Sequence, residues 1–384
     1  MHQNILPIGV YDKELDLFEN QYMLTEGISY NSYLIIDDKI ALFDTSDSRT
    51  AEEWWSNLRN ALPEGRGVDY LIVQHLEPDH SSQIAQLMEA YPECRLVCST
   101  AAARMLPLLT DTEGYADRIT TVNDGDLLDL GHHELEFLTA PMVHWPEVMM
   151  VFDKSTGTLF CADAFGRFGN PDPELPWACE ARRYYFNIVG KYGLPVQNIF
   201  KKIGARNIKI LAPLHGPVLE GDLKPYVDLY NCWSKYEVET EGVLVAYASI
   251  HGMTAVAAKK MAEILKEAGA PKVALADLTR DDQAEAIEDA FRMSHLVVMS
   301  STYDGDIFPP MHDFIHHLAL KTYRSRKVGI VENGLWAPAA GKKMADMFGK
   351  MTDITIAEPI VTLRGRLTEE TEEKLRDLAK NLLN

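Results

Sequence analysis

From about residue 242 onward, the chain alternates strictly between short apolar strands and helices. We expect strands at 243–248, 273–277, 295–301, 328–332 and 354–360, and helices at 255–268, 283–293, 310–320, 339–348 and 369–383. Strands separated by helices pair in parallel through right-handed βαβ crossovers. This part of the sequence therefore predicts a five-stranded, parallel, doubly wound sheet with helices on both faces.

The preceding part, up to about residue 216, consists of short apolar strands separated by polar loops. We expect these strands at 33–36, 40–43, 70–73, 96–98, 135–139, 148–152, 158–162 and 208–212. Helical patterns at 50–61 and 82–90 predict helices that cover the strands. Because the charged segment 235–241 has no apolar periodicity, we expect an α/β protein with two domains, residues 1–240 and 241–384.

Composition excludes several classes of partner. The chain has 37 Lys and Arg residues against 57 Asp and Glu residues, a net charge of −20, so we expect no nucleic-acid partner. It has no apolar run of about 18 residues, and charged residues interrupt the first twenty positions, so we expect no membrane partner and a cytoplasmic location. Five cysteines without a CxxC pair argue against a disulfide scaffold and against metal binding through sulfur.

The polar segment 74–80, Gln-His-Leu-Glu-Pro-Asp-His, directly follows the predicted strand 70–73. Extended backbone would place His75, Glu77 and Asp79 on one side. Since Pro78 argues against a helix interior, we expect a loop in which these side chains and His80 converge. Any one of them alone would more often be a capping or solvated residue, but four potential ligands within six positions favour a functional site.

Three further strand ends carry side chains of the same kind, at His144, Asp163 and His215. Asp163 follows the apolar residues 159–162, which predicts a partly buried carboxylate. Such a group is unfavourable unless it pairs or binds a cation, and a salt bridge to Arg167 is the alternative. Four other histidines follow no such pattern and are expected on the surface or on helices: His132, His133, His316 and His317.

A second candidate site follows the predicted strands of the C-terminal half. A loop of small and polar residues precedes the helix at 255–268, and Thr254 could cap that helix, so an ordinary capped βα turn is the alternative to an anion site. Neither GxGxxG nor GxxxxGK[ST] occurs. Two more loops lie where a sheet of order 2-1-3-4-5 has its switch point. The candidate cofactor-binding residues are Ser249, Ile250, His251, Gly252, Met253, Thr254, Thr302, Tyr303, Asp304, Gly305, Asn333, Gly334, Leu335 and Trp336.

Residues 75–80 resemble the metallo-β-lactamase signature HxHxDH, which is followed in that fold by a distant His, a bridging Asp and a last His. Here Glu77 replaces the second His, and this replacement is typical of flavodiiron proteins. The segments 144–146, 163–166 and 215–216 resemble that family too, and the C-terminal half resembles flavodoxin. The resemblance implies a metallo-β-lactamase-like αββα sandwich followed by a flavodoxin-like five-stranded parallel doubly wound sheet that binds FMN.

The same resemblance implies a non-haem diiron centre. By analogy, its ligands are His75, Glu77 and His144 for one iron, Asp79 and His215 for the other, and Asp163 as the bridge. Whether His80 completes the second iron site is left open. Carboxylates in place of imidazole favour iron or manganese over zinc. Tyr30, Trp145 and Phe165 are candidates for shaping the pocket, without a catalytic role.

Flavodiiron proteins reduce O2 to water or NO to N2O, so the resemblance implies an oxidoreductase that relays electrons through FMN. It also implies a head-to-tail homodimer, or a dimer of dimers, and a separate electron donor such as a rubredoxin or a flavin or F420-type reductant. The sequence does not rank O2 over NO. A zinc hydrolase fused to a flavodoxin-like module and a non-catalytic flavin electron carrier are the alternatives. Asp304 and Asp306 are expected to lower the flavin potential by like-charge repulsion.

Overall fold

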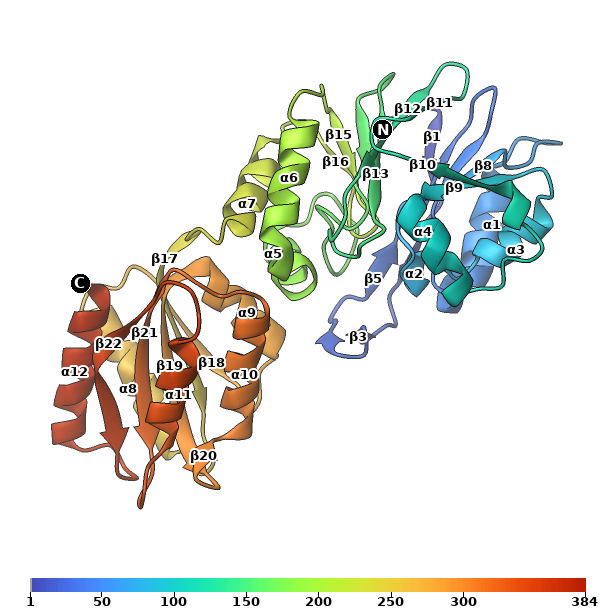
Figure 1. The fold of residues 1–384 in the computed structure, drawn as a ribbon. Coiled ribbons are helices and arrows are strands. Elements are labelled where there is room, and N and C mark those ends of the chain that lie inside the picture. The colour runs from blue at the N-terminus through green and yellow to red at the C-terminus, as the bar shows by residue number, and fades with distance from the viewer. Residues whose placement is uncertain (1) are drawn as a thin grey trace. The chain divides into compact units, whose positions relative to one another are not determined.

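The computed structural model describes residues 2–384 and divides into two compact units (Figure 1). The first unit runs to Tyr185 and includes Leu194–Tyr230, and the second comprises Phe186–Gly193 and Asn231–Asn384. The units therefore divide somewhat before the expected boundary at 240/241. The segment Phe186–Gly193 belongs to the second unit, where Phe186 stacks on Phe291 with ring centroids 4.4 Å apart.

The first unit contains two six-stranded sheets. One has the order β1 (Ile5–Pro7), β6 (Tyr33–Ile35), β7 (Ala41–Phe43), β8 (Tyr70–Val73), β9 (Arg95–Ser99) and β10 (Ile119–Val122). The other has the order β11 (Leu127–Asp129), β12 (Glu134–Thr139), β13 (Met149–Asp153), β14 (Thr158–Phe160), β15 (Ile210–Ala212) and β16 (Leu219–Glu220). Two short hairpins pair β2 (Val10–Asp12) with β5 (Ile28–Tyr30) and β3 (Leu17–Phe18) with β4 (Tyr22–Met23).

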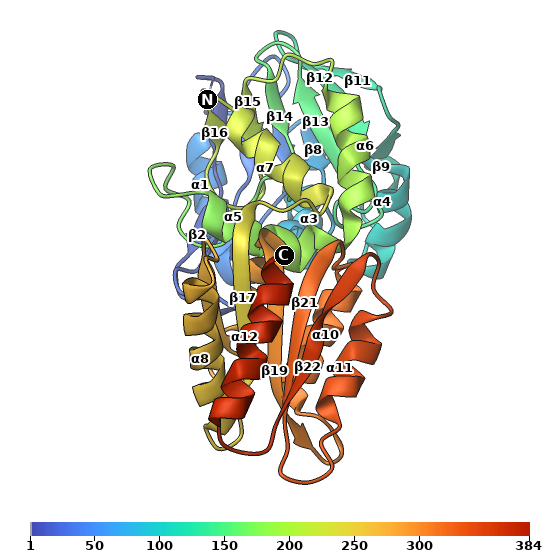
Figure 2. The ribbon, with the colours of Figure 1, turned by 90° about the vertical axis from the view of Figure 1, so that its left-hand side faces the viewer.

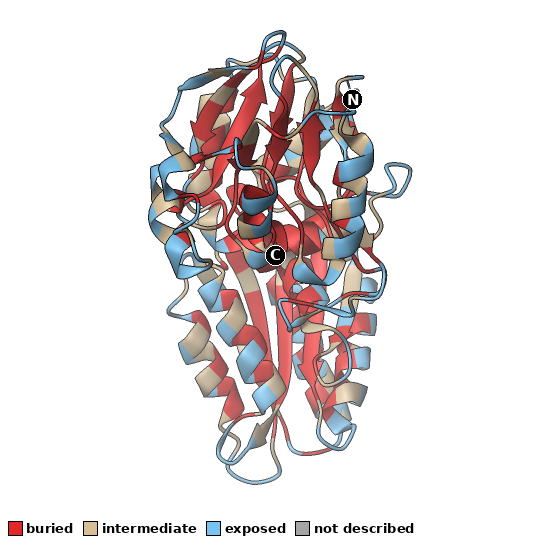
Figure 3. Ribbon diagram, turned by 90° about the vertical axis from the view of Figure 1, so that its right-hand side faces the viewer, coloured by how far each residue is buried: buried red, intermediate tan, exposed pale blue. Residues whose placement is uncertain are grey.

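Successive side chains of each strand point to opposite faces of the sheet, so the first sheet contributes to one core under the helices and to another between the sheets. On β8, Leu71 and Val73 pack with the helices over the first sheet, whereas Ile72 faces Phe137 and Phe160 in the core between the sheets. The helices of this unit are α1 (Ala51–Ala61), α2 (Pro78–Ser81), α3 (Ile84–Ala90), α4 (Thr100–Met105), α5 (Ala178–Tyr184), α6 (Gly193–Ile203) and the first part of α7 (Lys224–Ser234), whose last turn is assigned to the second unit. Figure 3 shows the buried strands in red and the helices with buried and exposed sides. The arrangement is the expected αββα sandwich.

The second unit is a parallel five-stranded sheet of order β18-β17-β19-β21-β22, as expected (Figure 2). Its strands are β17 (Thr240–Ala248), β18 (Val273–Asp277), β19 (Met293–Tyr303), β21 (Arg326–Asn333) and β22 (Ile354–Leu363), and the short β20 (Asp306–Ile307) pairs with β19. The helices are α8 (Met253–Glu267), α9 (Gln283–Arg292), α10 (Pro309–Leu320), α11 (Ala340–Phe348) and α12 (Glu369–Leu383). Helices α8 and α12 cover one face and α9, α10 and α11 the other (Figure 1).

Two local expectations are wrong. Residues 78–81 form the short helix α2 instead of a loop, because Pro78 occupies its first turn, where a missing N–H costs nothing. The alternative role of Thr254 as a helix cap is also wrong: the N-cap position of α8 is Gly252, in the left-handed conformation and without a side-chain cap, and Thr254 lies inside the helix. None of the helices between residues 2 and 384 is long and apolar enough to cross a membrane.

Candidate metal centre and cofactor loops

Four side chains from three strand ends meet in the first unit. His75 and Glu77 follow β8, His144 lies in the loop after β12, and Asp163 follows β14. The Oε2 atom of Glu77 lies 3.2 Å from Nε2 of His75 and 3.1 Å from Nε2 of His144. One ligand atom from each of the four residues lies within 4.8 Å of the others, so they could hold one metal ion.

A second group lies beside the first and contains Asp79, His80 and His215. The Nε2 atoms of His80 and His215 are 3.0 Å apart, and Oδ2 of Asp79 lies 3.3 Å from the first and 3.4 Å from the second. Glu77 precedes helix α2, whereas Asp79 lies within it. The side chain of Asp79 therefore does not lie on the same side of the backbone as those of His75 and Glu77, as an extended segment would have placed it. His80, which the sequence left open, therefore lies among potential ligands.

Asp163 faces both groups. Its Oδ2 atom lies 3.3 Å from Nε2 of His75 and 3.2 Å from Nε2 of His144, whereas Oδ1 lies 3.6 Å from Nε2 of His80 and 3.8 Å from Nε2 of His215. All seven candidate ligands are thus brought together, and Asp163 has the geometry of a bridge between two ions.

The donor set fits two hard cations. Both carboxylate oxygens of Asp163 and both of Asp79 are buried, and none accepts a hydrogen bond from any residue in the range 2–384. Their nearest polar neighbours are imidazole nitrogens at 3.2–3.8 Å. Buried carboxylates are costly unless a positive charge offsets theirs, which a bound cation would do. Three carboxylates and four imidazoles suit iron better than the tetrahedral sites typical of zinc.

Burial and close charges shift the pKa values of the cluster's side chains. Burial raises the pKa of Asp79 well above its ordinary value, and the charges of Glu77 and Asp163 raise it further. Burial and the neighbouring His215 keep the pKa of His80 well below its ordinary value. By contrast, the pKa of Asp163 is lowered, because His75 and His144 outweigh the opposing effect of burial. Burial thus favours neutral imidazole at His80, the form that binds metals. Without a cation in the cluster, Asp163 and Glu77 outweigh burial and raise the pKa of His75 and of His144, the latter to about 9.

Hydrogen bonds behind the cluster orient the imidazoles. Nδ1 of His75 lies 2.8 Å from Oε1 of Glu147, which also accepts a bond from the backbone N–H of Leu76 at 2.9 Å. Nδ1 of His215 lies 2.7 Å from the backbone carbonyl of Ser29. Both contacts leave Nε2 facing the cluster, as outer hydrogen bonds do around metal-binding histidines. Sequence reasoning missed Glu147, whose signal is an acidic residue two positions before the apolar strand β13.

The alternative prediction for Asp163, a salt bridge to Arg167, is wrong. Arg167 donates to the backbone carbonyls of Pro176, at 2.9 Å, and Asn170. Among the other histidines, His132, His316 and His317 are on the surface or on a helix as expected. His133 is not: it is buried, with Nδ1 2.8 Å from Oδ2 of Asp153.

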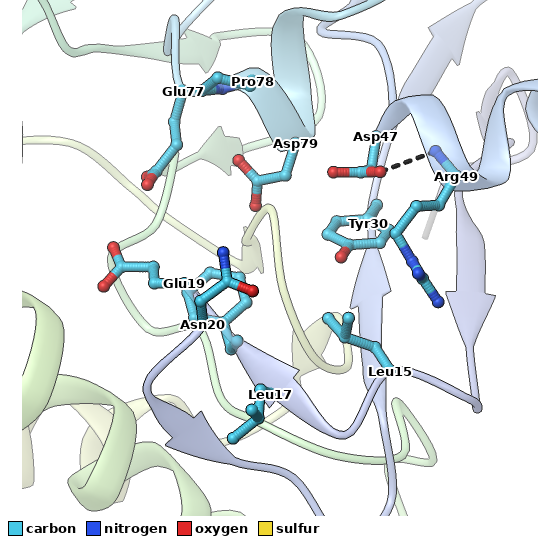
Figure 4. Close-up of a pocket in the computed structure, with 11 residues that line it drawn as sticks. Leu15, Leu17, Glu19, Asn20, Tyr30, Asp47, Arg49, Glu77, Pro78 and Asp79 are labelled. Carbon is cyan, nitrogen blue, oxygen red and sulfur yellow. Dashed lines mark hydrogen bonds between the residues drawn. The ribbon is translucent and has the colours of Figure 1, made fainter.

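An open pocket of about 350 Å³ leads to the cluster (Figure 4). It is lined by Leu15, Leu17, Phe18, Glu19, Asn20, Tyr30, Asp47, Arg49, Glu77, Pro78 and Asp79. Tyr30 thus lies where expected, and the tip of the β3–β4 hairpin adds Glu19 and Asn20, which the sequence did not indicate. In Figure 4 the Glu19 and Glu77 carboxyl groups lie on the same side of the pocket.

Aromatic rings pack around the imidazoles. The Trp145 ring lies 5.2 Å from that of His75, and the rings of Phe18 and Tyr184 each lie 5.5 Å from that of His215. Phe165 instead stacks on Tyr230 at 4.3 Å. Only Trp145 and Tyr30 among the three expected aromatics therefore contact or line the site.

In the second unit, the predicted cofactor loops lie at the carboxyl ends of β17, β19 and β21. Helix α8 begins at Met253 without a side-chain cap, so its first N–H groups are available to an anion. Thr254 instead places Oγ1 3.1 Å from Oγ of Ser301. Thr302 Oγ1 accepts bonds from the backbone N–H groups of Ala339 and Ala340 at 3.0 and 3.2 Å, which ties the second loop to the third.

Large apolar side chains remain exposed on these loops. Trp336 is 79% and Leu335 64% exposed, and Ile250, Met253 and Tyr303 are also exposed. Soluble proteins seldom leave such residues clustered in water without a ligand or partner. Apolar faces beside an uncapped helix start fit a flat aromatic ring that carries a phosphate, which is the composition of FMN.

The chain was compared with known proteins. A family model described as "ODP family beta lactamase" matches residues 28–216. The coenzyme F420H2 oxidase of Methanothermobacter marburgensis is 31% identical over 331 residues, which cover 81% of this chain and 79% of that protein. The anaerobic nitric oxide reductase flavorubredoxin of Vibrio vulnificus is 26% identical over 98% of this chain and 78% of its own length.

Solved structures have the same fold. The structure of the rubredoxin oxygen:oxidoreductase of Desulfovibrio gigas superposes with a TM-score of 0.92 at 21% identity, covering 100% of this chain and 97% of that one. The flavodiiron protein of Giardia intestinalis gives a TM-score of 0.91 at 22% identity and covers 100% and 95%.

This chain belongs to the flavodiiron protein family. Membership confirms the predicted pairing of a metallo-β-lactamase-like unit with a flavodoxin-like unit. It also confirms the predicted enzyme class, oxidoreductase, and the predicted cofactors, FMN and two non-haem iron ions.

Proposed function

We propose that the chain reduces O2 to water, NO to N2O, or both, at a diiron centre that receives electrons through FMN. Reduction of O2 to two water molecules consumes four electrons and four protons, and reduction of two NO to N2O and one water consumes two of each. Two iron ions and one flavin together store the four electrons that the first reaction needs. The relatives named for F420H2 oxidation and nitric oxide reduction support both substrates.

One observation carries the proposal: the two oxygens of Asp163 face two different histidine groups and accept no hydrogen bond from the described residues. We assign His75, Glu77 and His144 to one iron, and Asp79, His80 and His215 to the other. Asp163 would hold both ions, one through each carboxylate oxygen. When bound, the iron ions supply open coordination positions for a diatomic gas.

The protein's own residues prepare that site. Glu147 and the carbonyl of Ser29 fix the ring orientations of His75 and His215, so the ligand atoms are positioned before metal binds. The pocket bounded by Tyr30, Leu17 and Leu15 admits a small molecule to the side where Glu77 and Asp79 lie.

We also propose the finer features that family membership leaves open. Residues 1–240 carry the diiron chemistry and residues 241–384 bind FMN, with a separate rubredoxin or flavin or F420-type reductant as the donor. Since the two cofactors belong to different units, a head-to-tail homodimer, alone or paired as a dimer of dimers, would place one subunit's FMN beside the other's irons. A cytoplasmic location agrees with the free buried thiols of Cys94, Cys98 and Cys161.

The test is anaerobic reduction of the purified protein followed by rapid mixing with O2 or with NO. We expect about two iron atoms and about one FMN per chain, fast gas consumption, and no released peroxide. Faster turnover with one gas assigns the substrate. Zinc in place of iron together with esterase activity would contradict the proposal, and so would FMN-bearing protein that consumes neither gas.

A further inference from the structure

The three predicted flavin loops offer no lysine or arginine to the phosphate of FMN, and His251 is their only basic side chain. Residues 249–254, 302–306 and 333–339 contain no Lys or Arg, and the second of them contains Asp304 and Asp306. A phosphate monoester carries close to two negative charges at neutral pH, and the chain as a whole carries a net charge of −20. The uncapped start of α8 offers only partial positive charge.

A fourth loop reaches this site from the edge of the sheet. The segment 364–366, Arg-Gly-Arg, follows β22, and Asn333 binds both backbone polar groups of its central residue. Asn333 Oδ1 accepts a bond from the N–H of Gly365 at 2.9 Å, and Nδ2 donates to the carbonyl of Gly365 at 2.9 Å. Nδ2 also lies 3.3 Å from Oγ1 of Thr254 in the first turn of α8. Asn333 therefore joins the fourth loop to the start of α8.

The backbone at the centre of this loop favours glycine, since Gly365 has φ +84°. A Cβ there would lie 2.8 Å from Cδ2 of Leu335 and 3.6 Å from Sδ of Met253, which places the fourth loop beside the first and the third. Gly365 is buried, whereas Arg364 and Arg366 on either side of it are exposed and form no salt bridge with any residue that the structure describes.

We propose that residues 364–366 form a fourth loop of the flavin site and that Arg364 and Arg366, together with the amino end of α8, bind the terminal phosphate of the cofactor. The inference rests on the proposed use of FMN and makes the two arginines specificity-determining residues for a phosphorylated flavin over riboflavin. Guanidinium groups suit this role because they form paired, charge-assisted hydrogen bonds with phosphate oxygens.

To test this, FMN and riboflavin are titrated separately into flavin-free, full-length protein, and the dissociation constant of each is measured from the flavin fluorescence. Arg364→Gln and Arg366→Gln should each weaken FMN binding about tenfold, the effect of losing one charge-assisted hydrogen bond, and leave riboflavin binding unchanged. Arg364→Lys and Arg366→Lys, which keep the charge, should retain most of the FMN affinity. Arg376→Gln is the matched control, because Arg376 lies on α12 and pairs with Glu267 and Glu372.

Unchanged FMN affinity in both Gln variants would overturn the inference. Equal weakening of FMN and riboflavin would also overturn it, because the loop would then only support the ring. Wild-type protein that binds neither flavin would overturn the proposed function itself, so the two failures are distinguishable. Circular dichroism of each variant separates loss of phosphate binding from loss of folding.

Discussion

At the scale of single residues, the metal site depends on which atoms of each ligand are free. His80 is the case that the sequence left open. Its Nε2 lies 3.0 Å from that of His215, and its buried Nδ1 has no hydrogen-bond partner among the described residues. The Nε2 atoms of His80 and His215 both face Oδ2 of Asp79, at 3.3 and 3.4 Å, so both rings could bind one cation through Nε2.

We expect His80→Asn to reduce the iron content from about two atoms per chain toward about one, because the second group would lose one of its three side chains. Iron and protein are measured together on the purified variant. The matched control is His133→Asn, since His133 is equally buried but pairs with Asp153 away from the cluster. Full iron occupancy in His80→Asn would remove His80 from the ligand set.

A second prediction concerns acid stability. Burial opposes ionisation of Asp37, but the side chain of His132 and the backbone N–H groups of His133, Asp38 and His132 outweigh it and lower the pKa of Asp37 to about 2. Because this pKa is lower in the folded state, the stabilisation is complete above about pH 4 and is lost as the pH falls toward about 2.

Asp37→Asn should therefore lower the free energy of unfolding by about 1 kcal/mol at pH 7 and should flatten its dependence on pH between about 4 and 2. Urea unfolding of the full chain at several pH values measures both effects. Asp38→Asn, at an exposed neighbouring position, is the control. Equal pH profiles for wild type and Asp37→Asn would reject the assignment.

At the scale of elements, strand ends and helix starts position the chemistry. Helix α2 turns Asp79 and His80 away from His75 and Glu77, so a single seven-residue segment supplies ligands to two groups. In the second unit, Asn333 and Thr302 hold loops together with their side chains. These two residues, predicted as cofactor contacts, therefore also position the loops.

The loop after β19 gives a prediction about the flavin potential. Asp306 forms an ion pair with Lys343 at 2.8 Å, whereas Asp304, at φ +50° in the same turn, is exposed. Repulsion of an anionic reduced flavin should therefore come mainly from Asp304. We expect Asp304→Asn to raise the midpoint potential by roughly 20 mV, about 1 kcal/mol for a two-electron couple.

Asp306→Asn serves as the internal comparison in the same spectroelectrochemical titration, and we expect a smaller rise because Lys343 already offsets its charge. High salt should reduce the effect of Asp304→Asn, since exposed charges are screened. An unchanged midpoint in the double variant would show that neither carboxylate influences the flavin.

At the scale of the whole molecule, the two candidate sites belong to different compact units. The candidate metal ligands all lie in the first unit, and the four proposed flavin loops all lie in the second. Each unit has a core of its own, so each can position its site independently. The proposed head-to-tail dimer would bring the site of one chain beside the complementary site of its partner.

We expect activity per chain to fall when the enzyme is diluted below the dissociation constant of a head-to-tail dimer, while the FMN and iron contents stay constant. Turnover and sedimentation are measured over the same range of concentrations. Mixing an FMN-site variant with a His144→Ala variant should restore part of the activity, because a mixed dimer would contain one intact pair of cofactors. A monomer that stays fully active at high dilution would contradict the prediction.

The sequence alone determined the fold class and the candidate ligands, because both depend on local order. Alternating strands and helices allow few parallel sheets, and each candidate ligand lies within a few residues of the end of an apolar strand. Asp163, His144 and His215 could be found in this way without any knowledge of which strands are neighbours.

Tertiary structure decided the rest. The contacts that complete the two sites join residues far apart in the chain. They are Asp163 with His75, His75 with Glu147, His133 with Asp153, and Asn333 with Gly365. Such pairs depend on sheet order and register, which bring distant strand ends to one edge and which no local pattern encodes. The sequence identified the groups that could bind metal and flavin, and packing fixed which atoms face one another.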